Sequence, residues 1–150
     1  KPAFRSAMSY RRCIVPANGF YEWTGPKGAR RPFHIRRPGG GLMALAAIYE
    51  QWMGADGSEI DTMAILTVEA NRAVAALHDR MPAILEPREI SDWLDARAVD
   101  AKEAMALLPP ARALPLEIVE VAAKLNDKEI KAVAGLIPHA RRLLCRPYSA

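Results

Sequence analysis

The sequence predicts an α+β fold, with a mainly antiparallel, barrel-like β core and helices at its periphery. Strand-like segments occupy the first half of the chain and helix-like segments follow, an order typical of α+β proteins. Turns rich in glycine and proline separate the early strands, so we expect those strands to pair as hairpins. The chain has 150 residues, of which 51% are hydrophobic, and this fits a single globular domain over residues 1–150.

Segments rich in β-branched and aromatic residues predict a series of strands. We expect them at residues 12–15, 19–23, 32–36, 42–49, 61–67 and 116–121. Pro16 is expected to end the first strand, because proline has no backbone N–H to donate. Turn residues at 24–28 and 53–58 predict hairpin connections, and the nearly unbroken apolar run at 42–49 predicts a buried strand.

Helical patterns and helix-terminal residues predict the remaining elements. We expect a helix at residues 71–77, one that begins at residues 86–89, one capped by Asp100 and ended by Pro109, and one at residues 127–134. The second should turn Ile90, Trp93 and Leu94 inward. Asp100 and Glu103 have the spacing of a capping box.

Charge is distributed unevenly along the chain, although its net value is only +4. Residues 1–49 carry a net charge of +8, residues 50–137 carry −7 and residues 138–150 carry +3. If the two basic ends meet in the fold, they form a face suited to phosphates. Charge alone leaves open the alternative that these are ordinary solvated side chains.

Composition disfavours several classes of protein. No apolar run approaches the roughly 20 residues of a membrane-spanning helix, so we expect no membrane partner. The two cysteines and three histidines lack the spacing of a metal site, and no phosphate-binding loop or dinucleotide fingerprint is present, so we expect neither a metal nor a cofactor. Two cysteines are also too few for a disulfide framework, which fits a reducing, cytoplasmic location.

Glu22 is the first candidate for acid–base chemistry. It is the only carboxylate in residues 1–49, and it lies between aromatic residues in a positively charged segment. Strand alternation places it on one face with Phe20 and Thr24. Such a carboxylate is a candidate general acid or base, and the alternative is a structural ion pair with one of the many arginines.

His78 is the second candidate, next to Asp79 and Arg80 at the expected end of helix 71–77. A histidine there can transfer protons near neutral pH, and Arg80 can hold a phosphate with its planar guanidinium. The alternative is a helix-terminal histidine stabilised by the helix dipole, between surface charges. Thr67 is expected either to cap a helix or to offer its hydroxyl to a ligand.

Four segments in order resemble the signature segments of one family. They are residues 12–23 (RCIVPANGFYEW), 46–52 (AAIYEQW), 65–71 (ILTVEAN) and 78–85 (HDRMPAIL). Together with the pair Trp93–Leu94, they resemble the SOS response-associated peptidase family. The resemblance is strong over residues 1–94 and weaker over residues 114–137.

This resemblance implies a protein of the DNA-damage response that crosslinks covalently to abasic sites in single-stranded DNA. In the family, an N-terminal cysteine freed by self-processing forms a Schiff base with the opened sugar, and its thiol then closes a thiazolidine ring. By resemblance, Glu22 and His78 are catalytic, Arg80 and Thr67 bind DNA, and no metal takes part. A monomer associated with the nucleoid in the bacterial cytoplasm is expected.

The beginning of the chain departs from the family's pattern. The family places its nucleophilic cysteine upstream of the segment at 12–23, whereas Cys13 and Cys145 are not N-terminal. The sequence therefore resembles the family's domain without its N-terminal part. The alternative interpretation is a non-catalytic module that binds single-stranded nucleic acid, or an inactive fragment. A reading frame upstream of Lys1 that carries Met-Cys would favour the enzyme.

We expect residues 1–150 alone not to form the crosslink, because no N-terminal cysteine is available to supply both amine and thiol. The check is to incubate the purified chain with an abasic single-stranded oligonucleotide and to separate the products on a denaturing gel. Only free oligonucleotide is expected, and a covalent adduct would contradict this expectation.

Overall fold

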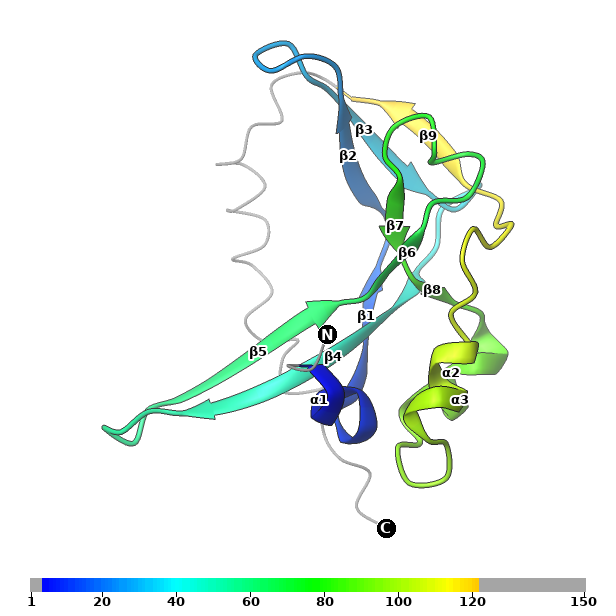
Figure 1. Ribbon diagram of the computed structural model, residues 1–150. Coiled ribbons are helices and arrows are strands. Elements are labelled where there is room, and N and C mark those ends of the chain that lie inside the picture. Colours follow the sequence, from blue (N-terminus) through cyan, green and yellow to red (C-terminus); the bar gives the residue numbers. More distant parts are fainter. Residues whose placement is uncertain (1–3, 122–150) are drawn as a thin grey trace.

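The computed structural model describes residues 4–121 of the chain. The expected helix at 127–134, the basic segment 138–150 and Cys145 lie outside these residues. The described part forms antiparallel sheets and a few short helices, which confirms the α+β class (Figure 1). Within residues 4–121 no sheet closes into a barrel, and three separate sheets form the β structure instead.

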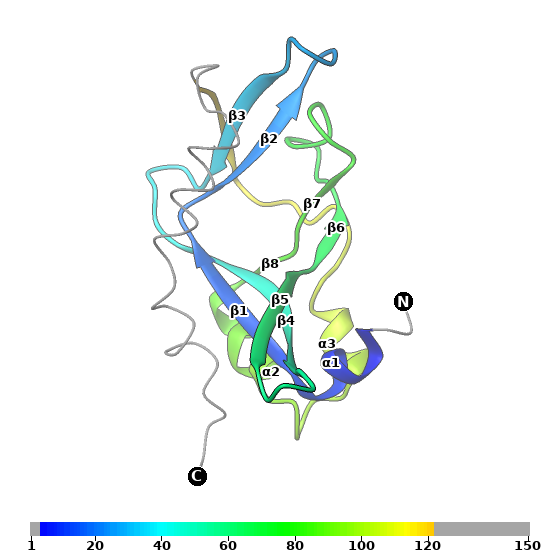
Figure 2. The same cartoon turned by 90° about the vertical axis from the view of Figure 1, so that its left-hand side faces the viewer.

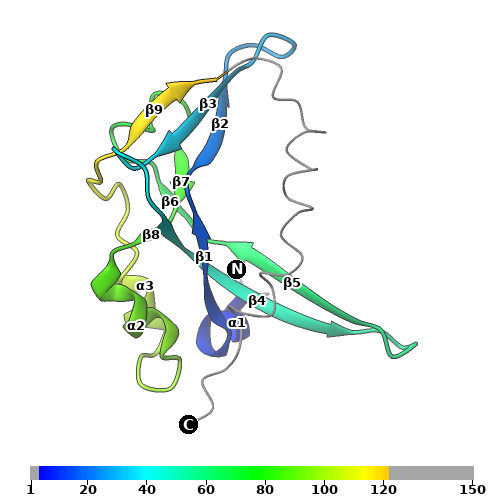
Figure 3. The ribbon, with the colours of Figure 1, turned by 180° about the vertical axis from the view of Figure 1, so that it is seen from behind.

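The first sheet is built around β4 (Met43–Met53). The edge strand β1 (Arg12–Ala17) pairs with it, as do β5 (Glu59–Ile65) and β8 (Ile84–Leu85). The first half of β4 is buried as expected, but its second half runs out with β5 as a hairpin that extends away from the body (Figures 1 and 3). Pro16 lies inside β1 rather than ending it, because an edge strand tolerates the missing N–H.

The second sheet has the strand order β2–β3–β9, and the third is the two-stranded pair β6–β7 (Figure 2). The strands are β2 (Phe20–Thr24), β3 (Arg31–Arg36), β9 (Glu117–Glu120), β6 (Thr67–Glu69) and β7 (Arg80–Pro82). The single strand expected at 61–67 is therefore divided between β5 and β6. The backbone N–H of Leu66 still bonds the Ala46 carbonyl of β4, and beyond Leu66 the chain pairs with β7 instead.

The helices are short, and the best capped is α3 (Ala101–Ala106). The others are α1 (Arg5–Tyr10), the 3₁₀ helix η2 (Pro87–Glu89) and α2 (Ile90–Leu94). Asp100 accepts hydrogen bonds from the backbone of Lys102 and Glu103, and the Glu103 carboxylate accepts the Asp100 N–H. The predicted capping box is thus confirmed.

Two helix predictions are wrong. Residues 72–77 form consecutive turns, which begin where the Asn71 carbonyl accepts from the N–H groups of Val74 and Ala75. The Asn71 side chain also accepts from Val74 N–H, and this local bond competes with helix formation in so short a segment. On α2, Trp93 is buried as expected, but Leu94 is 43% exposed because one short turn presents only one side to the core.

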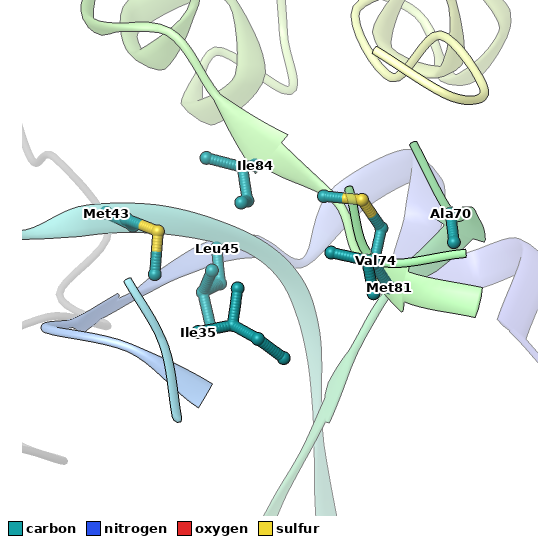
Figure 4. Close-up of a cluster of buried hydrophobic side chains, with 7 residues drawn as sticks. All are labelled: Ile35, Met43, Leu45, Ala70, Val74, Met81 and Ile84. Atoms are coloured by element: carbon teal, nitrogen blue, oxygen red, sulfur yellow. The ribbon is translucent and has the colours of Figure 1, made fainter. Parts of the chain in front are cut away.

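Two clusters of buried apolar side chains hold the sheets together. One joins all three sheets, with side chains from β3, β4, β7, β8 and the turn at 70–74 (Figure 4). Its members are Ile35, Met43, Leu45, Ala70, Val74, Met81 and Ile84. The second cluster surrounds Trp93 and packs α2 and α3 against the first sheet. The second and third sheets thus share one core.

A buried arginine connects the N-terminal part of the chain to the helices. Arg12 is 5% exposed and its guanidinium lies 5.8 Å from the Trp93 ring centroid. It donates hydrogen bonds to the backbone carbonyls of Met8, Trp93, Asp95 and Val99, at 2.6–3.0 Å. In return, the Trp93 indole N–H donates to the Cys13 carbonyl at 2.8 Å. One side chain therefore fixes α1, β1 and α2 relative to each other.

We predict that Arg12→Leu lowers the free energy of unfolding by about 3–5 kcal/mol, because four carbonyls lose a charged donor in a buried place. Urea unfolding followed by circular dichroism measures the change. The matched control is Arg97→Leu, which removes an exposed arginine from the adjoining loop and should change stability by less than about 0.5 kcal/mol. Equal losses in both variants would contradict a special role for Arg12.

Candidate functional site

β2 presents Glu22 toward the inner side of the second sheet. Glu22 pairs with Phe33 of β3, and strand alternation puts it on the same face as Phe20. Phe20 packs against the core that the second and third sheets share. The half-buried Glu22 therefore lies on the face of its sheet that packs on the core to which β6 and β7 contribute Val68 and Met81.

The pair β6–β7 brings Thr67 and Arg80 into contact. Val68 and Met81 anchor the pair in the core, while Thr67 and Arg80 are exposed. The Arg80 guanidinium donates to the Thr67 hydroxyl at 3.0 Å and to the Thr67 carbonyl. Thr67 thus holds one edge of the guanidinium, and Arg80 Nη1 has no hydrogen bond within residues 4–121. That free donor can bind an anion.

His78 lies at the end of the loop that joins β6 to β7, and its side chain is 47% exposed. The Arg80 backbone N–H donates to His78 Nδ1 at 3.0 Å. When Nδ1 accepts this bond, the ring proton resides on Nε2. The Asp79 carboxylate lies 3.1 Å from Nδ1 and stabilises the ring when it is doubly protonated. The hydrogen bond to Nδ1 therefore fixes the orientation of a ring whose Nε2 edge is, within residues 4–121, free to contact a ligand.

The four residues singled out from the sequence fall into two groups. Thr67, His78 and Arg80 lie together on one pair of strands, and hydrogen bonds link Arg80 to each of the others. Glu22 lies on the second sheet and has no hydrogen bond or ion pair to them in the described part of the chain. The two groups are connected through the shared core beneath them.

The basic first part of the chain is largely neutralised by ion pairs. Acidic residues from other segments pair with Arg11, Arg31, Arg36 and Arg37. Arg12 is buried. Within residues 4–49, the basic side chains without an ion pair are Arg5, Lys27 and Arg30, and two of these lie at the β2–β3 turn. Within this first part of the chain, most of the unpaired positive charge therefore lies at that turn.

Sequence reasoning missed His34 as a site residue, because it weighed His34 only as a metal ligand. The β2–β3 register places His34 opposite Tyr21, and their rings stack with centroids 4.8 Å apart. The ring also lies against Gly19, where an added Cβ would come within 2.1 Å of His34 Nε2. Only glycine fits there, and the pairing of the two strands was the signal that could have revealed it.

No cluster of three or more potential metal ligands occurs among residues 4–121. Over the same residues, no helix is long and apolar enough to cross a membrane. Cys13 is buried in β1.

Three antiparallel sheets with short helices define an α+β architecture, and solved structures of other proteins share it. A protein of Bacteroides thetaiotaomicron, a structural genomics target, superimposes with a TM-score of 0.75 and 29% identity, covering 82% of this chain and 54% of that one. The family model of the SOS response associated peptidase (SRAP) matches residues 1–128, and the chain belongs to that family.

Named relatives agree with this assignment. The chain is 34% identical over 132 residues to "Abasic site processing protein YobE" of Bacillus subtilis, covering 87% of this chain and 60% of YobE. It is 37% identical over 121 residues to "Abasic site processing protein HMCES" of Gallus gallus, covering 67% of this chain and 36% of HMCES. The chain therefore spans only part of the length of these relatives.

We predict that His34 makes the stability of the fold sensitive to acid. Burial, reinforced by the positive charge of Arg36, lowers the pKa of His34 below its ordinary value of 6.5. The unfolded chain then binds a proton more readily than the folded protein, so stability is retained above about pH 6.5 and falls as the pH decreases below it. His34→Gln should remove this part of the pH dependence.

Urea unfolding at a series of pH values from neutral to about 5 measures this effect. The control His78→Gln removes an exposed histidine and should leave the acid-induced loss of stability in place. An unchanged pH profile for His34→Gln would contradict the prediction.

Proposed function

We propose that the protein processes abasic sites in single-stranded DNA by crosslinking to them, as part of the DNA-damage response. The observation that carries this proposal is the family match over residues 1–128, together with relatives named abasic site processing proteins. The exposed group of Thr67, His78 and Arg80 supports it, because it combines an anion-binding donor with a proton-transfer group on one pair of strands.

The proposed reaction uses the amine and the thiol of an N-terminal cysteine. The amine adds to the aldehyde carbon of the opened sugar, and loss of water gives a Schiff base. The thiol then adds to the C=N bond and closes the thiazolidine ring. Each step moves protons near neutral pH, which is the role we assign to Glu22 and His78. Release of the cysteine by self-processing belongs to the same proposal.

In this proposal Arg80 holds a phosphate of the DNA strand through its free Nη1, and Thr67 keeps the guanidinium in place. The protein binds as a monomer and needs no metal or cofactor, because the amine, thiol, carboxylate and imidazole supply every group that the reaction uses. Residues 1–150 provide the acid–base and phosphate-binding groups but not the nucleophile.

A second candidate function is a non-catalytic module that binds single-stranded DNA. The observation that favours it is the position of Cys13, which is the only cysteine within residues 4–121. Cys13 is 1% exposed, and its nitrogen is a peptide amide, so it cannot supply the amine and thiol of the crosslink. In this case Arg80 would still bind phosphate, and Glu22 and His78 would have no chemical role.

We predict that Glu22→Gln and His78→Ala each slow crosslinking by about 10²–10⁴-fold, the range typical of general acid–base groups. The full open reading frame that encodes this chain is expressed, and single-turnover crosslinking to an oligonucleotide with one abasic site is followed on denaturing gels. Arg80→Gln should instead weaken the binding of DNA and raise the DNA concentration at which the rate is half-maximal.

The control for charge is Glu59→Gln, which changes an exposed carboxylate on the distant β4–β5 hairpin and should leave the rate unchanged. Wild-type rates for both Glu22→Gln and His78→Ala would exclude the assigned roles. If the full protein binds single-stranded DNA but forms no adduct, the binding module is the correct interpretation.

A further inference from the structure

The outer face of the second sheet carries an aromatic cluster that the proposed chemistry does not use. Tyr21 stacks on His34 with an interplanar angle of 28°, and its ring centroid lies 6.2 Å from that of Trp23. Tyr21 and Trp23 alternate with Glu22 along β2 and therefore lie on the opposite face, and His34 lies on that same face of β3, opposite Tyr21. Tyr21 is 37% exposed, so the cluster is open to a planar ligand.

The cluster is held in place before any ligand binds. Gly19 leaves the space that the His34 ring fills, and the Ile35 carbonyl lies on the same side. Burial and the charge of Arg36 lower the pKa of His34, which keeps its imidazole neutral at physiological pH. A rigid, neutral ring supports Tyr21 from behind, and a preorganised surface loses less entropy on binding.

The two long hairpins of the molecule carry net charges of opposite sign. Residues 20–37, which form the β2–β3 hairpin, carry a net charge of +4, whereas residues 43–65, which form the β4–β5 hairpin, carry −4. The two hairpin tips extend from opposite ends of the body (Figure 1). The carboxylates of β9 beside the aromatic cluster, Glu117 and Glu120, are neutralised by Arg36 and Arg31. Since Arg31, Arg36 and Arg37 are engaged in ion pairs, the unpaired cations of this hairpin are Lys27 and Arg30, which attract a polyanion to the β2–β3 turn, whereas the β4–β5 hairpin has no basic residue and repels it.

We propose that the outer face of the β2–β3–β9 sheet is a stacking platform for unpaired bases of single-stranded DNA that flank the abasic nucleotide. The inference rests on the proposed function, since it assigns a subsite to the same DNA strand. Exposed aromatic rings beside basic side chains are the usual means of binding unpaired bases without sequence preference. Lys27 and Arg30 at the β2–β3 turn contact the phosphates of the stacked nucleotides.

The position of β2 at the edge of its sheet makes this arrangement possible. Glu22 and Tyr21 are adjacent in sequence and lie on opposite faces of an edge strand. A DNA strand whose abasic sugar lies near Glu22 can pass over the open edge of β2 and place its next bases on Tyr21. If β2 were a central strand, a neighbouring strand on its other side would block that path.

The test measures binding of the 150-residue chain to a fluorescein-labelled oligothymidylate of about 12 nucleotides that contains a stable abasic analogue. Tyr21→Ala should raise the dissociation constant roughly 5–150-fold, as expected for the loss of one stacked base. Tyr21→Phe retains the ring and should bind like the wild type. Tyr10→Ala removes an exposed tyrosine from α1 and is the matched control.

The salt dependence distinguishes stacking from phosphate contacts. Tyr21→Ala should leave the slope of log K against log salt unchanged, whereas Lys27→Gln and Arg30→Gln should each reduce it by about 0.7. Thermal melting of each variant confirms that it is folded. If the wild type binds and Tyr21→Ala binds equally well, the platform is excluded while the proposed function stands. If the wild type does not bind at low salt, both fail.

Discussion

The fold depends on the buried guanidinium of Arg12. This one side chain donates hydrogen bonds to four backbone carbonyls and lies against the Trp93 ring. The Trp93 indole N–H in turn donates to the carbonyl of Cys13, the next residue of β1. Without Arg12, the buried Trp93 carbonyl would be desolvated without a donor, at a free-energy cost of about 1–3 kcal/mol, and three part-buried carbonyls would lose a charged donor. Because the guanidinium offers five N–H donors in a fixed plane, it can satisfy carbonyls from several segments at once. The helices are too short to be stable alone, and this connection holds them on the first sheet.

The candidate site depends on a second constraint, the core that the second and third sheets share. β6 and β7 are only three residues long each, and Val68 and Met81 fix them by burial rather than by pairing. Thr67 and Arg80 lie on the face of β6–β7 opposite to Val68 and Met81, whereas Glu22 lies on the inner face of β2, so the two groups are connected through this core and not by direct contact. The same alternation that turns Glu22 inward turns Tyr21 and Trp23 outward, so the edge strand β2 presents different chemistry on its two faces.

Much of the fold was predictable because its signals are local. The strands at 32–36 and 42–49, the turn at 53–58 and the capping box at Asp100 follow from side-chain pattern and turn chemistry, and each is confirmed. Two of the errors arose where a distant partner decides, whereas the helix expected at 71–77 is replaced by turns for a local reason, the side-chain hydrogen bond of Asn71. Pro16 continues a strand because β1 is at an edge, and the segment 61–67 changes partner from β4 to β7. In the candidate site, the residues Glu22, Thr67, His78 and Arg80 came from their motifs, and their roles remain proposals.

The sequence by itself determined the α+β class, the family and the candidate site residues, because strand periodicity and ordered motifs depend on neighbouring positions in the chain. Only the tertiary structure decided which charges are available to a partner. Ion pairs across long sequence separations neutralise Arg31 and Arg36, and Arg12 is buried. Within residues 4–49 the basic side chains left unpaired and accessible are Arg5 and, at the β2–β3 turn, Lys27 and Arg30. Likewise, the contact between Tyr21 and His34 exists only once β2 pairs with β3 in one register. Such contacts join residues that are remote in sequence. Their formation depends on packing energies, which cannot be predicted from a local sequence pattern.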